Sequence, residues 1–489
     1  MTTTASGPQT IRSLIPARMD RLPWTRFHWT VVVGLGTAWI LDGLEIQIVS
    51  ANAFAKQLGM TGDNAWMVGF TGTIYLLGQV VGALVFGRLS DRLGRKRFFI
   101  VTLAIYLIGS GIAGLAFAPW FLWIFRFIAG MGIGGEYTAI NSAIDEIIPS
   151  KYRGRIDIAI NGTYWGGAAL GAAAYLFLLN QPVLEESGWG WRIGFFIGPV
   201  LGLIIIFLRR HVPESPRWQI THGHEAEAEA NVTRIEQEVA DEAHSKLDPV
   251  PDSKAIEIPV HDRVPFTVVA HTLFRRYPKR TLVAFAMMVT QSFLYNAIFF
   301  TYALVLTTFY KIPEGQIPLF FFPFAIGNLL GPLILGPLFD TIGRKQMIFA
   351  TYAIAAVVLA VSGALFSAGA LTAVTQTILW CICFFFASAG ASSAYLTVSE
   401  TFPLQLRGQA ISYFFSIGQL VGAFAPTIFS ILIGAGKSRE PLAGGYYFGA
   451  GMMFVGGVIA LIFGVRAERQ SLEDISDVAF IDKAMEHRS

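Results

Sequence analysis

Stretches of about 20 mostly apolar residues recur along almost the whole of this 489-residue chain. An α-helix needs a stretch of that length to cross the hydrocarbon core of a bilayer. In lipid every backbone N–H and C=O must find a partner within the protein, so only helices or a closed barrel can span the membrane. These stretches are too long and too evenly apolar for barrel strands. The sequence therefore predicts an all-α integral membrane protein.

Twelve of these stretches are expected to form transmembrane helices. Apolar residues make up 54% of the chain and charged residues only 14%, whereas about a quarter of the residues in a soluble protein are charged. The predicted spans are about 29–53, 65–87, 98–118, 120–144, 155–181, 191–208, 281–310, 316–338, 346–368, 371–398, 408–435 and 443–466.

The basic residues are distributed unevenly between the loops on the two sides of these spans. Those on one side are few: Lys56, Arg192, Lys311, Lys437 and Arg439. Apart from Arg126, which lies inside a span, all the others lie on the second side together with both termini. The positive-inside rule makes the second side cytoplasmic. We therefore expect a multi-pass cell-membrane protein, and the net charge of +3 reflects topology rather than a nucleic-acid partner.

Two short signatures each occur twice, about 250 residues apart. The first signature contains Gly87, Asp91, Gly94 and Arg95, and it returns as Gly336, Asp340, Gly343 and Arg344. The second contains Glu146 and Arg153, and it returns as Glu400 and Arg407. Two repeats at nearly one offset indicate a duplicated half, which is the usual construction of secondary transporters.

The repeat divides the chain into two pseudo-symmetric six-helix halves joined by a linker. Good helix formers between His224 and His244 predict a solvated helix in that linker. The expected parts are a cytoplasmic N-terminal segment (1–28), the N-terminal half (29–208), a cytoplasmic linker (209–280), the C-terminal half (281–466) and a cytoplasmic tail (467–489).

With these residues in view, the chain resembles the major facilitator superfamily over about residues 25–468. The duplicated loop signature is similar to that of the superfamily, and so is Arg126 followed by alternating glycines up to Gly135. The run from Pro213 to Arg217 resembles a mark of sugar porters. The resemblance implies a secondary transporter that works by alternating access, in which two halves rock about a site near the membrane midplane.

The duplicated charges predict a gate at the cytoplasmic ends of the helices. Ion pairs among them can lock the two halves together, and breaking these pairs opens the inner side. The alternative is that the basic residues only anchor the topology, but that role does not require the acidic residues to be duplicated. The predicted gating residues are Asp91, Arg95, Glu146, Arg153, Asp340, Arg344, Glu400 and Arg407.

Four charged residues lie well inside the spans, away from the span ends, where each costs roughly 2.5–3.5 kcal/mol. Asp42 and Glu45 have i,i+3 spacing and share one helix face, while Arg126 and Glu136 lie in the fourth span. In proton-coupled sugar porters an acid on span one faces the arginine of span four, and Glu45 and Arg126 resemble that pair. The run from Asp42 to Glu45 also resembles a motif of aromatic-acid/proton symporters. The alternative is a static brace between Glu45 and Arg126.

The resemblance to sugar porters also implies which residues line the cavity. Amides suit hydroxyl-rich ligands because each offers a donor and an acceptor. Departures from the sugar-porter pattern make the cavity more aromatic through Tyr164, Tyr295 and Tyr302, as a flat ring or a carboxylate-bearing substrate would require. The alternative role for each amide is helix–helix hydrogen bonding. The predicted substrate-binding residues are Asn161, Trp165, Gln291, Tyr295, Asn296, Asn328 and Tyr395.

The sequence thus predicts a proton symporter of a small polar metabolite, with sugars or polyols and organic or aromatic acids both open. An uncoupled facilitator is the nearest alternative, and a drug exporter or a transporter-like nutrient sensor are further ones. No enzymatic constellation, nucleotide-binding loop, cofactor or metal site is expected. The expected partners are a small-molecule substrate, protons and the lipid bilayer, with the protein acting as a monomer.

Overall fold

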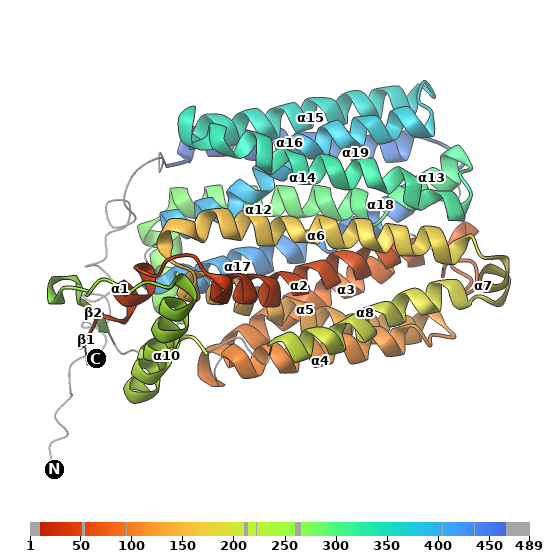
Figure 1. Ribbon diagram of the computed structural model, residues 1–489. Helices are drawn as coiled ribbons and strands as arrows, with labels where there is room; N and C mark the ends of the chain where they lie inside the picture. The colour runs from red at the N-terminus through yellow and green to blue at the C-terminus, as the bar shows by residue number, and fades with distance from the viewer. Residues whose placement is uncertain are drawn as a thin grey trace, which may run out of the picture.

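The computed structural model describes residues 10–50, 54–93, 95–209, 214–221, 223–259, 266–402, 404–434 and 436–465. Long helices run nearly side by side in one elongated bundle (Figure 1). One end of the bundle carries α10 (Glu225–Ala243) and the other carries α7 (Pro182–Ser187). These are called the α10 end and the α7 end below.

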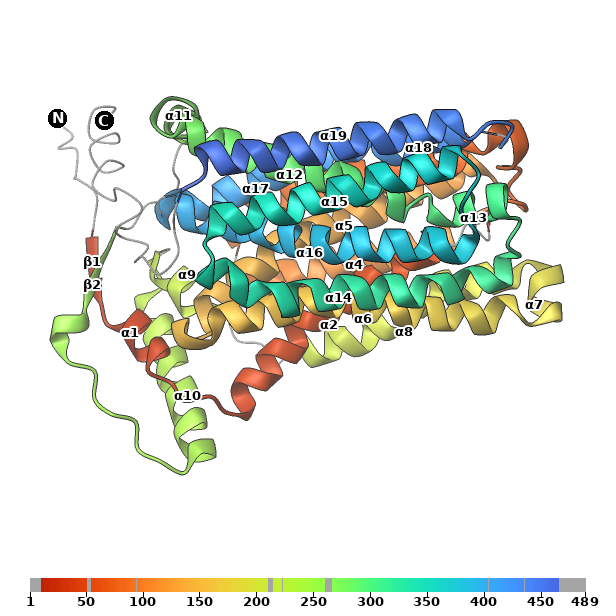
Figure 2. The same cartoon turned by 90° about the horizontal axis from the view of Figure 1, so that it is seen from above.

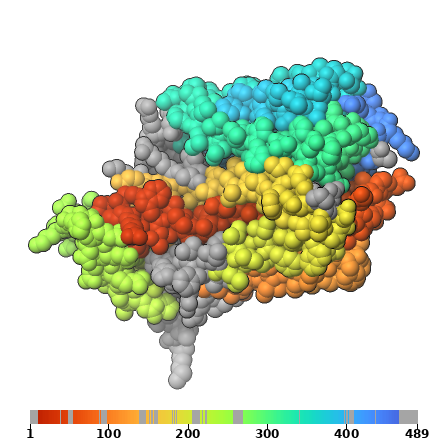
Figure 3. All heavy atoms as spheres, turned by 45° about the vertical axis from the view of Figure 1, so that its right-hand side comes forward, coloured from red at the N-terminus to blue at the C-terminus, as the bar shows by residue number. Residues whose placement is uncertain are grey.

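Two helical halves lie against each other along the bundle (Figures 1 and 3). The first consists of α2 (Arg26–Ser50), α3 (Trp66–Leu93), α4 (Arg95–Ala113), α5 (Pro119–Ile147), α6 (Ser150–Leu179) and α8 (Trp189–Arg209). The second consists of α12 (Pro278–Phe299), α13 (Tyr302–Tyr310), α14 (Ile317–Thr341), α15 (Arg344–Ser367), α16 (Ala373–Thr401), α17 (Leu404–Gly422), α18 (Ala425–Ile433) and α19 (Glu440–Phe463). The predicted all-α membrane fold is confirmed. Within the described residues, eight helical stretches are long and apolar enough to cross a membrane.

Two of the predicted spans are not single helices. The span 281–310 is broken between Phe299 and Tyr302, and the span 408–435 is broken between Gly422 and Ala425. Pro426, in the first turn of α18, lacks an N–H and so suits a helix start. Both breaks face α3 of the other half. A methyl group on Gly72 would meet the ring of Phe300, and one on Gly69 would meet the carbonyl of Pro426.

The loop between α14 and α15 shows what its signature glycine does. Gly343 has a φ of 116°, a backbone conformation that residues other than glycine rarely adopt. The chain can therefore reverse here and begin α15 at Arg344. The matching Gly94 lies outside the described residues.

A short β-ribbon joins the N-terminal segment to the linker. β1 (Thr10–Ser13) pairs antiparallel with β2 (Ile256–Pro259), with Ile11 opposite Ile258. No sequence pattern indicates this two-stranded ribbon, because each strand is only four residues long. Shorter elements complete the chain: α1 (Ile15–Asp20), η1 (Gly62–Asn64), α9 (Pro216–Thr221), η2 (Asp252–Lys254), α11 (Phe266–His271), η3 (Thr272–Arg276) and η4 (Glu314–Gln316).

The linker helix α10 lies within the stretch that the sequence predicts to be helical, and one of its faces is buried. It projects beside α1 at one end of the bundle (Figure 2). Its apolar residues fall on one face at helical spacing and are buried against α1 and the nearby ends of α2 and α9. That face consists of Ala228, Val232, Ile235 and Val239.

Charged contacts reinforce the packing of α1 on α10. Arg18 forms ion pairs with Glu229 and with Glu236, the latter through Nη2 at 2.6 Å from Oε2. One residue of α10 also reaches α2, because Oε2 of Glu242 accepts the backbone N–H of Phe27 at 2.9 Å. A carboxylate there satisfies a donor in the first helical turn and complements the helix dipole. The linker helix is thus attached to the helix that carries Asp42 and Glu45.

We expect Arg18→Ala to loosen α1 from α10 without unfolding the bundle. The substitution removes both ion pairs and the hydrogen bond from Nη2 to Thr233 at 3.2 Å. Hydrogen–deuterium exchange should speed up at least tenfold in residues 10–22 and stay unchanged in α12, since local opening follows local contacts. Arg12→Ala is the matched control, because Arg12 is exposed and, among the described residues, its side chain bonds one carbonyl, that of Asp252. Equal effects of both variants would contradict this assignment.

The same contact is expected to weaken in acid. Burial raises the pKa of Glu236, but hydrogen bonds from Arg18 and Arg21 outweigh burial and hold the pKa below its ordinary value of 4.5. A carboxyl whose pKa is lowered by folding contributes stability above the unfolded pKa and loses it as the pH falls through the folded value. Exchange protection of residues 10–22 should therefore be flat above about pH 5 and fall below about pH 4. In Glu236→Gln this acid-dependent loss should shrink.

Candidate functional site

A buried ion pair joins α2 to α5 inside the first half. Nη1 of Arg126 donates to Oε1 of Glu45, and the two side chains are 0% and 1% exposed. Nε and Nη2 of Arg126 find no hydrogen-bond partner among the described residues. A static brace in this setting would be expected to satisfy every donor, because an unsatisfied buried donor costs about 1–3 kcal/mol.

Asp42 lies one helical turn from Glu45 and is held by two tyrosines. The hydroxyl of Tyr75 on α3 donates to Oδ1 at 2.7 Å, and the hydroxyl of Tyr137 on α5 donates to Oδ2. The ring of Tyr75 also lies over the guanidinium of Arg126, with 3.9 Å between Cζ and the ring centroid. Sequence reasoning missed both tyrosines, since tyrosine is common in apolar spans and neither lies in a motif.

The fourth predicted ionisable residue, Glu136, is buried on α5 with 1% of its surface exposed. It lies close enough to Asp42 to act on its charge, as do Glu45 and Arg126. The structure therefore brings together all four residues predicted for proton coupling. Within the described residues, no group of His, Cys, Asp or Glu side chains is arranged to hold a metal ion.

Aromatic rings from both halves meet near the middle of the bundle. Trp165 on α6 lies 6.1 Å from the ring of Tyr295, 6.0 Å from Phe299 and 5.9 Å from Phe324, measured between centroids. Phe384 lies 4.8 Å from Tyr295 and 4.7 Å from Phe324. These five residues are called the aromatic cluster below. Such a surface suits a flat ring, which gains area and edge-to-face contacts there.

Asn328 supports this cluster. Its Oδ1 accepts the hydroxyl of Tyr295 at 2.8 Å, and its Nδ2 donates to the carbonyl of Phe324 at 2.9 Å. The side chain is fully buried. These bonds fix the direction of the Tyr295 hydroxyl, so Asn328 acts here through Tyr295.

The remaining predicted amides differ in how many hydrogen bonds they make within the protein. Gln291 has its Oε1 buried without a hydrogen-bond partner among the described residues, whereas Asn296 donates to Ser292 at 3.2 Å. Ser292 in turn donates to Gln419 at 2.7 Å, and Gln419 donates to Gln79 of the first half at 2.8 Å.

Buried amides are also found in the first half. Gln79 lies in α3, and Gln47 lies in α2. Both Gln79 and Gln419 could have been noticed in the sequence, since each is an amide within an otherwise apolar span.

Asn161 and Tyr395, like Gln291 and Asn296, make no described contact with the aromatic cluster. The side chain of Asn161 lies outside the described part of α6. Tyr395 is half-buried in α16, eleven residues from Phe384. At 1.5 Å per residue this places it about 16 Å along the helix, toward the α10 end.

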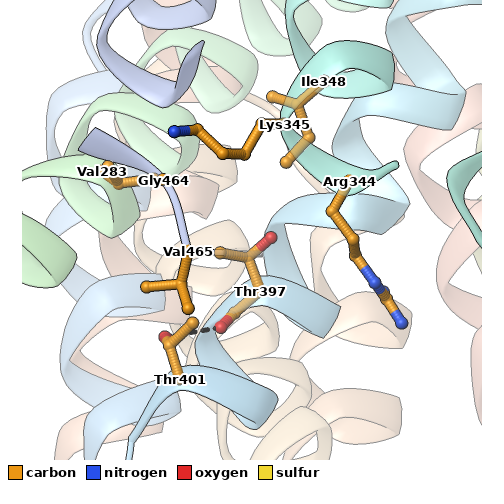
Figure 4. Close-up of a pocket in the computed structure, with 8 residues that line it drawn as sticks. All are labelled: Val283, Arg344, Lys345, Ile348, Thr397, Thr401, Gly464 and Val465. Carbon is orange, nitrogen blue, oxygen red and sulfur yellow. Dashed lines mark hydrogen bonds between the residues drawn. The ribbon is translucent and has the colours of Figure 1, made fainter. Parts of the chain in front are cut away.

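Most of the predicted gating side chains also lie outside the described residues: Asp91, Arg95, Glu146, Arg153, Asp340, Glu400 and Arg407. Arg344 is described and is 8% exposed. It lines a pocket at the start of α15 together with Lys345, Thr397, Thr401, Val283, Ile348, Gly464 and Val465 (Figure 4). In that view the side chains of Arg344 and Lys345 point in different directions, so the two cations do not converge.

At the α7 end, hydrogen bonds connect the two halves. Nε2 of Gln47 donates to the hydroxyl of Tyr302 at 2.7 Å, and the hydroxyls of Thr73 and Thr427 lie 2.7 Å apart. Nδ2 of Asn180 donates to the carbonyl of Gly315 at 3.2 Å. The halves are therefore in contact at this end of the site.

Comparison with known proteins shows the family to which the chain belongs. Residues 37–479 match the family described as "Sugar (and other) transporter". The chain is 27% identical over 427 residues to the niacin transporter NiaP of Acinetobacter baylyi, covering 84% of this chain and 89% of that protein. It is 26% identical over 488 residues to the inner membrane metabolite transport protein YdjE of Escherichia coli, covering 95% and 98%.

Solved structures show the same fold. A partially occluded inward-open conformation of the xylose transporter XylE from Escherichia coli aligns with a TM-score of 0.71 at 17% identity, covering 91% of this chain and 100% of XylE. Family and fold are those of transporters. This chain belongs to the sugar (and other) transporter family of the major facilitator superfamily, and it is a multi-pass cell-membrane protein that moves a small metabolite by secondary transport.

Proposed function

We propose that this protein is a proton symporter for a small organic acid with a flat ring, working by alternating access. The observation that carries the proposal is the buried group of Asp42, Glu45 and Arg126 in the same bundle as the aromatic cluster. No catalytic step is part of this function.

The charge network supports proton coupling. A membrane protein that needed only a brace could use apolar packing, because burying a charge pair is costly. Here a second carboxylate, Asp42, is held beside the Glu45–Arg126 pair, and two donors of Arg126 lack partners among the described residues. A carboxylate that loses or gains its cationic partner between two states can take up and release a proton.

The aromatic cluster supports a flat ring as cargo. Trp165, Tyr295 and the three phenylalanines present ring faces and edges from both halves. The relative from Acinetobacter baylyi is named a niacin transporter, and niacin is a six-membered aromatic ring that bears a carboxylate. A cluster shared between halves would close around such a ring.

A sugar or polyol is the second candidate. It is favoured by the amides Gln291, Asn296 and Gln419, which offer donors and acceptors to hydroxyl groups. Uncoupled transport of either cargo is the remaining alternative on the same fold.

The proposed orientation makes the α10 end cytoplasmic. The α10 end carries β1 and α1 of the N-terminal segment together with α10 of the linker (Figures 1 and 2). Its excess of Lys and Arg agrees with the positive-inside rule. The proposed gate of duplicated charges would open this end while the contacts at the α7 end hold, with the protein acting as a monomer in the bilayer.

Uptake into proteoliposomes tests the proposal. We expect radiolabelled nicotinate or 4-hydroxybenzoate to accumulate above equilibrium when the side facing the α7 end is acidic, and xylose or glucose to accumulate much less. Collapse of the pH gradient with a protonophore should abolish accumulation. Gradient-independent equilibration would support the uncoupled facilitator, and accumulation of sugars alone would overturn the choice of an acid.

Trp165→Ala is expected to weaken binding of the aromatic acid about 10- to 100-fold, since stacking on an aromatic side chain is worth roughly 1–3 kcal/mol. The measurement is the dissociation constant of purified protein in nanodiscs. Trp120→Ala is the matched control, because Trp120 is 53% exposed on α5 and outside the cluster. An equal loss for both variants would show that the ring of Trp165 does not contact the cargo.

A further inference from the structure

The two hydroxyls that hold Asp42 differ in their surroundings. Tyr75 is fully buried within the first half, with its ring against the Arg126 cation. A methyl group added to Gly130 would come within 2.1 Å of the backbone oxygen of Tyr75, so α3 and α5 are packed backbone to backbone there. Tyr75 has little room to turn.

Tyr137 lies at the boundary between the halves. Its side chain is half-buried, and its ring lies 4.5 Å from Trp39 on α2 and 5.8 Å from Phe415 on α17 of the second half. Of the two tyrosines whose hydroxyls bond Asp42, Tyr137 is therefore the one whose ring contacts the second half, so movement of the halves changes its surroundings.

Hydrogen-bond accounting shows what protonation of Asp42 requires. An ionised carboxylate accepts only, so it can take the hydrogens of both phenols, as the contacts with Tyr75 and Tyr137 show. A protonated carboxyl donates from one oxygen. The phenol at that oxygen must then accept, and its own hydrogen is free for another acceptor.

From this arrangement we propose that Tyr137 is a specificity-determining residue, which donates its hydroxyl hydrogen to the carboxylate of the transported acid once Asp42 is protonated. The inference rests on the proposed function and adds to it the group that recognises the anion. A proton from the acidic side binds Oδ2 of Asp42, Tyr137 accepts that O–H, and the hydroxyl of Tyr137 turns its hydrogen to the substrate. Tyr137 itself gains and loses no net proton.

A second donor lies beside it. Nε1 of Trp39 is buried and has no hydrogen-bond partner among the described residues. Its ring packs on that of Tyr137, so an anion bound at Tyr137 could also receive this N–H. A buried donor without a partner is costly unless a ligand satisfies it in another state.

The charge of Asp42 also agrees with an order in which the proton binds before the acid. While Asp42 is ionised, it repels an anion and occupies the hydrogen of Tyr137. Protonation removes both obstacles at once, which couples the proton to the acid. Among the described residues, the titratable and charged groups that act on Asp42 from the packed helices are Glu45 on its own helix, Tyr75 on α3, Tyr106 on α4, Arg126, Glu136 and Tyr137 on α5, and Tyr164 on α6.

The test compares nicotinate with nicotinamide, which has the same ring without the charge. Dissociation constants are measured for the full chain in nanodiscs at pH 5.5 and pH 7.5. Wild type should prefer nicotinate at pH 5.5 and lose most of that preference at pH 7.5. Tyr137→Phe should bind nicotinate about tenfold more weakly at pH 5.5, with little change for nicotinamide, since one charge-assisted hydrogen bond is lost.

Two further variants separate recognition from structure. Tyr75→Phe removes the other hydroxyl on Asp42 and keeps the ring on Arg126, so it should retain the preference for nicotinate. Asp42→Asn cannot ionise and should prefer nicotinate equally at both pH values. The thermal unfolding midpoint of each variant is measured to check that the variant is folded.

Equal losses for nicotinate and nicotinamide in Tyr137→Phe, or the same selective loss in Tyr75→Phe, would overturn the inference. So would a wild type that binds both rings equally at both pH values. Proton-driven accumulation of nicotinate by a Tyr137→Phe protein with unchanged preference would leave the proposed function standing and remove only this step. Accumulation of sugars alone would remove both.

Discussion

Glu45→Gln is expected to abolish proton-driven accumulation and to destabilise the protein by about 3–5 kcal/mol. The substitution leaves the guanidinium of Arg126, which is 0% exposed, without its counter-charge. Breaking one partner of a buried pair costs more than removing both, because the remaining charge stays desolvated. The measurements are the thermal unfolding midpoint in nanodiscs and uptake of the labelled acid with and without a pH gradient.

The double variant Glu45→Gln/Arg126→Gln separates a brace from a coupling pair. Two amides can hydrogen-bond to each other, so stability should return close to that of wild type. Gradient-driven accumulation should stay absent, while exchange of substrate down its own gradient is retained. If the double variant accumulates substrate like wild type, the pair is a structural brace, and Asp42 alone handles the proton.

The features predicted from the sequence are those that depend on composition and on motifs. The length of the apolar stretches and the two doubled signatures were enough for the membrane fold and its two halves. Asp42, Glu45, Arg126 and Glu136 could be picked out because an ionisable residue in a span is rare. Their proximity in the structure follows from that same cost, since buried charges need partners.

What the sequence could not indicate are contacts made by common residue types. Tyr75 and Tyr137 are two of 15 tyrosines, and nothing in their neighbours marks them as partners of Asp42. The break between Phe299 and Tyr302 contains no proline or glycine, so no local signal ends the helix there. It depends on packing against Gly72 of the other half, a contact remote in sequence. The ribbon of β1 and β2 likewise depends on pairing between segments about 245 residues apart.

Gly69→Ala is expected to reduce net transport by about 5- to 150-fold, because it opposes closure of the α7 end. In the closed arrangement the added methyl carbon would lie 2.1 Å from the carbonyl oxygen of Pro426 and 2.2 Å from the hydroxyl oxygen of Ser430. Backbone cannot yield as a flexible side chain can, so α3 and α18 must separate at a cost of about 1–3 kcal/mol. A shift of that size moves a two-state equilibrium by the same factor.

The structural readout is the distance between spin labels at Asn64 and Lys437, two exposed positions at the α7 end, with Cys381 and Cys383 replaced by serine. Gly69→Ala should shift the distribution to longer distances and leave the unfolding midpoint nearly unchanged. Gly444→Ala is the matched control, because nothing lies within 4 Å of a methyl group added there. Unchanged distances with lost transport would mean that Gly69 acts on the cargo path rather than on closure. Because closure at one end and opening at the other are alternatives in a rocking pair of halves, a block at Gly69 should also slow release at the α10 end.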